Sequence, residues 1–132
     1  TIAITHQINR NKSLFIKQII MNEDPVYYSL AKLNKLANGN SDFIEKMIQL
    51  FIDTTPAEIE NIRNYFKIGK YAAVSQIAHK LIPSIDYICT KPLDEEIRKI
   101  EAIEKNSASI SEVEIEATLS KIESAIRQLK SR

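Results

Sequence analysis

His79 is one of two histidines in this chain of 132 residues, and it lies in a segment whose pattern predicts a helix over residues 70–88. At about 100° per residue, His79 lies about 150° from the centre of the apolar stripe of this helix. The sequence therefore predicts that the imidazole points into solvent, whereas a lone helical histidine is usually a satisfied core residue. The apolar stripe has the three- and four-residue spacing of a single helix face and consists of Val74, Ile77, Ala78, Leu81, Ile85 and Ile88.

The residues expected to share the face of His79 are small or uncharged, whereas an ordinary exposed helix face carries Lys and Glu. Such neighbours leave room for another molecule to approach the imidazole. A neutral imidazole is a competent nucleophile without a general base, and a phosphorylated imidazole is a high-energy species suited to onward transfer. The pattern is compatible with a reactive histidine, and an incidental surface histidine remains open as the alternative. The neighbours are Ala72, Ser75, Gln76 and Pro83, with Ile82 at the border.

The segments before this helix also have helical periodicity, and the only two glycines, Gly39 and Gly69, fall between periodic segments. A first helix is expected to begin at Asp24-Pro25, which has the form of an N-cap followed by proline at the first helical position. It is expected to stop at Asn38-Gly39, a typical C-terminal signal. Its inward residues are predicted to be Leu30, Leu33 and Ala37.

Two separate helices are expected between the glycines. Asn40 or Ser41 can cap the first of them, and its apolar positions are Phe43, Met47, Leu50 and Phe51. The sequence Thr55-Pro56-Ala57-Glu58 has the form of a capping box with proline in its first turn, so it is expected to open another helix that ends at Gly69. The buried residues of that helix are predicted to be Ile59, Ile62 and Phe66.

Two more helices are expected after residue 88. Pro92 starts one whose apolar side carries Leu93, Ile97, Ile100 and Ile103. Ser111 to Glu114 forms a second capping box, with Ile110 and Ile115 placed as a hydrophobic staple, and the inward residues that follow are Leu119, Ile122, Ile126 and Leu129. Because short loops favour antiparallel neighbours, the expected fold is all-α. It is an antiparallel up-and-down four-helix bundle over residues 26–132, with additional N-terminal helical segments.

Composition limits the class of protein. One domain is expected, and 44% hydrophobic with 27% charged residues indicates an ordinary globule, neither disordered nor embedded in a membrane. A net charge of +1 gives no signature of binding to nucleic acid or to an anionic membrane. Cys89 is the only cysteine, so no internal disulfide can form and a reducing compartment, the cytoplasm, is expected. The apolar run Leu14–Ile16 is too short for a signal peptide or a membrane span.

No other set of residues has the spacing of a catalytic or metal site. Two histidines in different segments, His6 and His79, do not make a ligand set. The acidic run 94–96 falls in the first turn of a helix, where it complements the helix dipole. A glycine-rich phosphate loop, a Ser-His-Asp arrangement and a zinc motif are missing from the sequence. No cofactor or metal is therefore expected, and the chain lacks the ATP-binding machinery of a kinase.

The sequence Ala78-His79-Lys80-Leu81, on a helix preceded by two helical segments of this kind, resembles the histidine-phosphotransfer (HPt) domain of bacterial phosphorelays. The similarity covers about residues 26–106. It implies a four-helix antiparallel bundle from whose middle the active histidine projects, and a carrier that is not itself an enzyme. Further residues that match the family pattern are Leu33, Gly39 to Phe43, Leu50-Phe51, Pro56, Gly69 and Ile100-Glu101.

The resemblance also implies roles for residues and partners. His79 would take a phosphoryl group from an aspartate of one response-regulator receiver domain and give it to another, with Mg²⁺ held by the receiver. A hybrid histidine kinase is a further expected partner, and the chain is expected to be a monomer. The residues expected beside the phosphoryl group are Ser75, Gln76 and Lys80, and those expected to dock the receiver are Ala72, Ile82, Pro83 and Asp86.

Two positions depart from the family pattern, which usually has Lys three residues and Gly four residues after the histidine. Here they are Ile82 and Pro83. The usual lysine partly neutralises the phosphoryl group, and the long stem of Lys80 could bend toward that group instead. Pro83 removes the hydrogen bond to the His79 carbonyl, so a bend in the helix is expected near His79.

Two other functions remain open. One is a degenerate HPt-like domain that docks a receiver without phosphotransfer, as the residues at 82 and 83 suggest, and the other is a plain helical interaction or dimerisation module. Residues 1–25 are expected to be an N-terminal extension. They allow an extra helix around residues 15–21, a linker from an upstream receiver or kinase domain, or residues foreign to the protein.

Overall fold

The computed structural model describes residues 25–132, and helices are the regular elements of this part of the chain. The expected all-helical class is confirmed, and the single β-bridge between Tyr28 and Cys89 is the only strand-like pairing among these residues. The interpretations offered for residues 1–24 lie outside the described residues. The elements are α2 (Ala31–Ala37), α3 (Ser41–Lys67), α4 (Tyr71–Ile88), α5 (Leu93–Glu101), the 3₁₀ turns η1 (Ala102–Glu104) and η2 (Ser107–Ser109), and α6 (Glu112–Ser131).

The N-terminal helix is shorter than expected, because Pro25 does not begin it. Residues 25–30 run outside any helix, and α2 starts at Ala31. The backbone of this stretch is paired with the end of α4 instead: the Ser29 N–H donates to the Ile88 carbonyl at 2.8 Å, and the Thr90 N–H donates to the Tyr27 carbonyl at 3.0 Å. These bonds satisfy backbone N–H and C=O groups that would have bonded within the helix if α2 had begun earlier.

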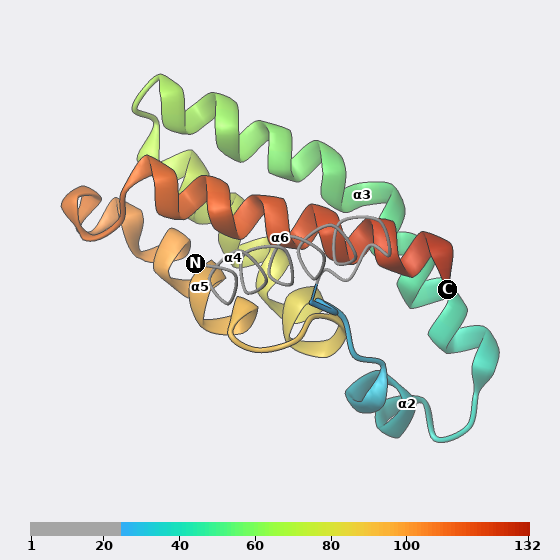
Figure 1. Cartoon of the computed structure of the whole chain (residues 1–132). Helices are drawn as coiled ribbons and strands as arrows, with labels where there is room; N and C mark the ends of the chain where they lie inside the picture. Colours follow the sequence, from blue (N-terminus) through green and yellow to red (C-terminus); the bar gives the residue numbers. More distant parts are fainter. Residues whose placement is uncertain (1–24) are drawn as a thin grey trace, which may run out of the picture.

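The expected end of α2 is confirmed. Asn38 has a left-handed backbone with φ of 48°, and Gly39 follows at φ of 87°. A left-handed residue at this position lets the helix stop and the chain turn. Leu33 is buried as predicted, and Figure 1 shows α2 at the end of the structure where α3 begins.

α3 is a single helix of 27 residues, which corrects the two helices expected on either side of Pro56. Thr55, the expected cap, lies inside this helix and is 1% exposed. Pro56 removes a hydrogen bond to the carbonyl of Ile52 and crowds it, which kinks a helix without ending it. The ribbon of α3 changes direction along its length (Figure 1). The helix continues because apolar residues on both sides of the proline face one core, namely Ile48, Phe51, Ile59 and Ile62.

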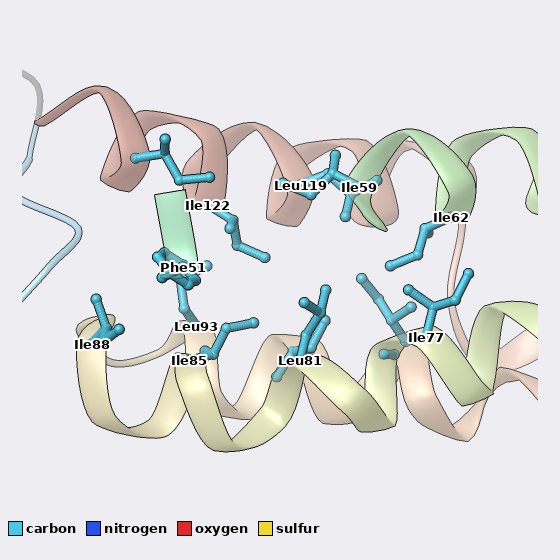
Figure 2. Close-up of a cluster of buried hydrophobic side chains, with 14 of the residues drawn as sticks. Phe51, Ile59, Ile62, Ile77, Leu81, Ile85, Ile88, Leu93, Leu119 and Ile122 are labelled. Atoms are coloured by element: carbon cyan, nitrogen blue, oxygen red, sulfur yellow. The ribbon is translucent and has the colours of Figure 1, made fainter. Parts of the chain in front are cut away.

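The core lies between four helices, since α3 and α5 each pack against both α4 and α6. Figure 2 shows side chains from α4, including Leu81 and Ile85, directed toward Phe51, Ile59 and Ile122 on the opposite helices. Every residue of the predicted α4 stripe is buried, and so are the predicted apolar residues of α5 and α6. The helical periodicity of these three segments therefore predicted their inward faces correctly.

One core prediction in α3 is wrong. Leu50 was expected to face inward but is 56% exposed, and its neighbour Ile48 is buried at 1% exposure instead. The two residues lie about 200° apart around a helix, so the inward face of the first half of α3 is rotated from the one expected. Phe43 and Met47 are partly buried against the core.

Side-chain caps fix two of the helix starts as predicted. Asn40 Oδ1 accepts a hydrogen bond from the Phe43 N–H at 3.1 Å, and Ser111 Oγ accepts one from the Glu114 N–H at 3.2 Å. The staple residues Ile110 and Ile115 are both buried beside the second cap. These bonds satisfy backbone donors that a helix start leaves without internal partners.

One guanidinium group joins α3 to α6. Arg63, whose side chain is 19% exposed, donates to Glu116 at 2.6 Å and to Glu123 at 2.8 Å on α6, and it also pairs with Glu60 on its own helix. Its bonds to Glu123 and Glu116 raise the pKa of Arg63 above its ordinary value, and the bond from Arg63 holds the pKa of Glu116 below its ordinary value.

Among residues 25–132, no helix is both long and apolar enough to cross a bilayer.

Candidate functional site

His79 projects from the middle of α4 into solvent. Its side chain is 78% exposed, which confirms the orientation expected from the helix periodicity. One edge of the ring is nevertheless held in place: Nδ1 lies 2.7 Å from Oε2 of Glu101, at the end of α5. The side chain of Glu101 is 36% exposed, so the pair lies at the surface, in the groove between the two helices.

This contact determines which ring nitrogen is available for chemistry. A carboxylate oxygen only accepts hydrogen bonds, so Nδ1 must carry the proton of the neutral imidazole. The lone pair then lies on Nε2, the nitrogen at the far edge of the ring. A carboxylate that accepts from one nitrogen also fixes the orientation of the ring. The arrangement is that of an oriented nucleophile with its reactive nitrogen facing away from the protein.

The chain folds in a way that places Glu101 at the level of His79. From His79 to the end of α4 there are nine residues, or about 13 Å of helix. α5 begins at Leu93 and runs back along α4 for eight residues to Glu101, or about 12 Å. Ile97 and Ile100 are fully buried and pin α5 against the core. The residue after Ile100 therefore lies beside the histidine.

A hollow of about 350 Å³ opens next to the imidazole. Its walls come from α4 on one side and from the end of α5 with η1 on the other. The lining residues are Ser75, Gln76, His79, Glu101, Ala102, Glu104 and Lys105. Gln76 lies on the exposed face as expected, one helical turn before His79.

Ser75 is not on the exposed face, contrary to expectation. It is 6% exposed, and its Oγ accepts a hydrogen bond from the Glu104 N–H at 3.1 Å. The sequence did not predict the 3₁₀ turn η1, which packs against α4 at this point and covers Ser75. The hydroxyl therefore fixes the wall of the hollow, and this side chain does not lie open beside the imidazole.

Lys80 extends away from the His79–Glu101 pair. Its Nζ lies 3.5 Å from Oε1 of Glu58, a carboxylate on α3, and its side chain is 69% exposed. His79 is bonded to α5, which packs on another side of α4. The lysine expected beside a phosphoryl group is therefore paired elsewhere in this structure.

Of the four residues expected to dock a partner, two are exposed and two are only partly exposed. Ala72 and Pro83 are exposed, while Ile82 is partly buried against the core. Asp86 is held by two hydrogen bonds from Arg98 at 2.9 and 2.7 Å, which keep the pKa of its carboxyl below its ordinary value. Pro83 lies within α4 and cannot donate to the carbonyl of His79. The bend expected there stays a prediction.

The sequence predicted no role in the site for Glu101, Ala102, Glu104 and Lys105, which all lie around His79. Glu101 entered only as part of a family pattern. The distance of Glu101 from the start of α5 matches the distance of His79 from the end of α4. This match could have predicted the contact between the two residues. Lys105 follows a turn that has no recognisable signal in the sequence.

Comparison of the chain with protein-family models, with curated proteins and with solved structures gives no match. The residues around His79, and not a relative, must therefore support any functional assignment.

Proposed function

We propose that this chain is a phosphorelay intermediate of the HPt type, which accepts a phosphoryl group on Nε2 of His79 from a receiver-domain aspartate and passes it to another receiver. The observation that carries the proposal is the exposed imidazole of His79, whose Nδ1 is held 2.7 Å from the Glu101 carboxylate. An incidental surface histidine has no need of a carboxylate that orients its ring.

The proposed transfer is a displacement at phosphorus. The Nε2 lone pair attacks the phosphorus of an aspartyl phosphate, the P–O bond to the aspartate breaks, and the carboxylate leaves with the electron pair. The ring then carries the phosphoryl group on Nε2 and the proton on Nδ1, so it gains positive charge that the Glu101 carboxylate stabilises. In the second transfer the aspartate of another receiver attacks phosphorus, and the P–N bond electrons return to Nε2.

The helical arrangement supports the same proposal. We propose that α3, α4, α5 and α6 form an antiparallel up-and-down four-helix bundle, with α2 added at one end. Their packing in a ring around one core is consistent with it. The Ala78-His79-Lys80-Leu81 sequence, which resembles the HPt motif, lies on the central stretch of α4.

The remaining features follow from this function. The chain would be a carrier and not an enzyme, monomeric and cytoplasmic, with no cofactor of its own and with Mg²⁺ held by the receiver. Receivers and a hybrid histidine kinase would be its partners. The receiver would dock on the exposed face around His79, over Ala72, Gln76 and Pro83, with Ile82 at its border.

The test is transfer from a panel of receiver domains phosphorylated beforehand with acetyl phosphate. Wild-type chain and His79→Gln are incubated with each receiver, and the adduct is located by mass spectrometry of the peptide that contains residue 79. Acid lability and base stability identify it as a phosphoramidate bond. Circular dichroism of both proteins shows that the substitution leaves the fold intact.

We expect an adduct on the wild type and none on His79→Gln. Receiver binding without an adduct on the wild type would replace the proposal with a degenerate docking domain. Absence of both binding and adduct would favour a plain helical interaction module.

A further inference from the structure

We propose that Lys105 supplies the positive charge that contacts the phosphoryl group on His79. This inference rests on the proposed function, and it assigns a direct electrostatic role to a residue on a different element from the histidine. The alternative cation, Lys80, is adjacent to His79 in sequence but paired with Glu58.

Lys105 shares the hollow beside the imidazole. It follows η1 directly, and its backbone N–H donates to the Ala102 carbonyl at 3.1 Å. The residue before it is fixed to α4 by the hydrogen bond from the Glu104 N–H to Ser75 Oγ. The backbone from which the lysine extends is therefore held against the helix that carries His79. A lysine side chain adds a flexible four-carbon stem and an ammonium group with three donors.

Once His79 is phosphorylated, the hollow would hold several negative charges, and a cation would reduce the repulsion between them. Glu101 and Glu104 both line the hollow, and the phosphoryl group would bring up to two further negative charges to the same place. Lys105 is the only cationic side chain in the lining. It belongs to none of the ion pairs found within residues 25–132, so its ammonium group can turn toward the phosphoryl oxygens without breaking a bond.

Nearby cations are already committed to carboxylates. Arg98 binds Asp86 at 2.7 Å, and Lys99 lies 3.9 Å from Glu114. Both are on α5, yet neither lines the hollow. No covalent bond forms in the proposed contact, and the proton stays on Nζ. Its effect is electrostatic, so the dianionic phosphoryl group is favoured and its second ionisation occurs at lower pH.

The test uses phosphoramidate as donor, because it needs no cognate receiver. Nε2 attacks its phosphorus, the P–N bond breaks and ammonia leaves. Wild type, Lys105→Ala and Lys105→Arg are phosphorylated in this way, with Lys80→Ala as the rival variant and Lys99→Ala as the matched control. The ³¹P chemical shift of the phosphohistidine is then followed against pH, at low and at high salt.

We expect Lys105→Ala to raise the midpoint of the phosphoryl ionisation by about 0.5 pH unit, Lys105→Arg to restore it, and Lys99→Ala to leave it unchanged. High salt should shrink the difference, because exposed charges are screened. An unchanged midpoint in Lys105→Ala, or a shift in Lys80→Ala instead, would overturn the role of Lys105 and leave the proposed function standing. A wild type that takes up no phosphoryl group at residue 79 would overturn both.

Discussion

Glu101 Oε2 lies 2.7 Å from His79 Nδ1, although the two residues are 22 positions apart and on different helices. The contact leaves Nε2 as the free nitrogen of an exposed ring. The contact therefore predicts which nitrogen is phosphorylated: the phosphoryl group should be on Nε2 and not on Nδ1.

Glu101 can be tested with two variants. Glu101→Gln keeps an oxygen that accepts from Nδ1–H but removes the charge, so we expect Nε2 phosphohistidine formed roughly tenfold more slowly. Glu101→Ala removes both, so we expect the slower rate together with a mixture of the Nδ1 and Nε2 isomers. NMR of the phosphorylated protein distinguishes the isomers. Glu104→Ala, which removes a carboxylate that makes no hydrogen bond to His79, is the control, and an unaltered product in Glu101→Ala would contradict the role of Glu101.

The buried face of α4 gives a prediction for stability. Ile85 is fully buried, and Ile85→Ala should lower the free energy of unfolding by about 3 kcal/mol because it leaves a cavity. Leu50→Ala is the matched comparison: Leu50 is 56% exposed, so the change should stay within about 0.5 kcal/mol. Urea unfolding followed by circular dichroism measures both. A comparable loss in the two variants would mean that Leu50 belongs to the core.

Arg63 is expected to contribute to stability through its two partners on α6. Arg63→Met keeps an apolar stem but leaves three carboxylates without their cation, and we expect a loss of about 2 kcal/mol. Chemical unfolding at neutral pH checks the magnitude. The double variant Arg63→Met with Glu123→Gln should recover part of the loss, since one unpaired charge is removed. No recovery would indicate that packing and not charge explains the effect.

Two separate arginine–carboxylate contacts make the stability of the fold depend on pH in the acidic range. The hydrogen bond from Arg63 holds the pKa of Glu116 below its ordinary value of 4.5, and that from Arg98 does the same for Asp86. A carboxyl with a lowered pKa stabilises the folded state above its unfolded pKa, and this contribution disappears as pH falls through the folded value. We expect the thermal unfolding midpoint to decrease at pH values below about 4.5. This decrease with falling pH should be less steep in Arg63→Met. Equal slopes would contradict the assignment.

Cys89 should be an unreactive thiol. Burial raises its pKa to about 12, so little thiolate exists near neutral pH. We expect alkylation by iodoacetamide at pH 8 to be much slower in the folded protein than in urea, where the thiol regains its ordinary reactivity. Mass spectrometry of the intact chain gives both rates, because Cys89 is the only cysteine. Equal rates would show that the thiol is accessible.

Helical periodicity predicted much of this structure. The inward residues of α4, α5 and α6 and the outward direction of His79 follow from a 3.6-residue repeat, which a local sequence determines. Helix boundaries were less predictable where local signals were ambiguous. The Thr55–Glu58 sequence is a good helix start in isolation, but burial of apolar residues on both sides of Pro56 carries α3 through it.

The site was predicted in part. The exposed histidine could be found on one helix, whereas the contact with Glu101 depends on how the chain turns between residues 89 and 92 and sends α5 back along α4. The burial of Ser75 depends in the same way on η1, a short turn from a neighbouring segment. Contacts between elements are not encoded in the periodicity of either element alone.

The non-helical segment at the start of the described chain has a mechanical consequence. Residues 25–30 are joined to the end of α4 by backbone hydrogen bonds, and Gln128 on α6 bonds the Tyr27 N–H and the Pro25 carbonyl. A pull applied at residue 25 would therefore be borne by α4 and α6, the helix of His79 and the helix at the opposite end of the chain. α2 and α3, which follow this segment directly in sequence, would feel the load only after those bonds had broken.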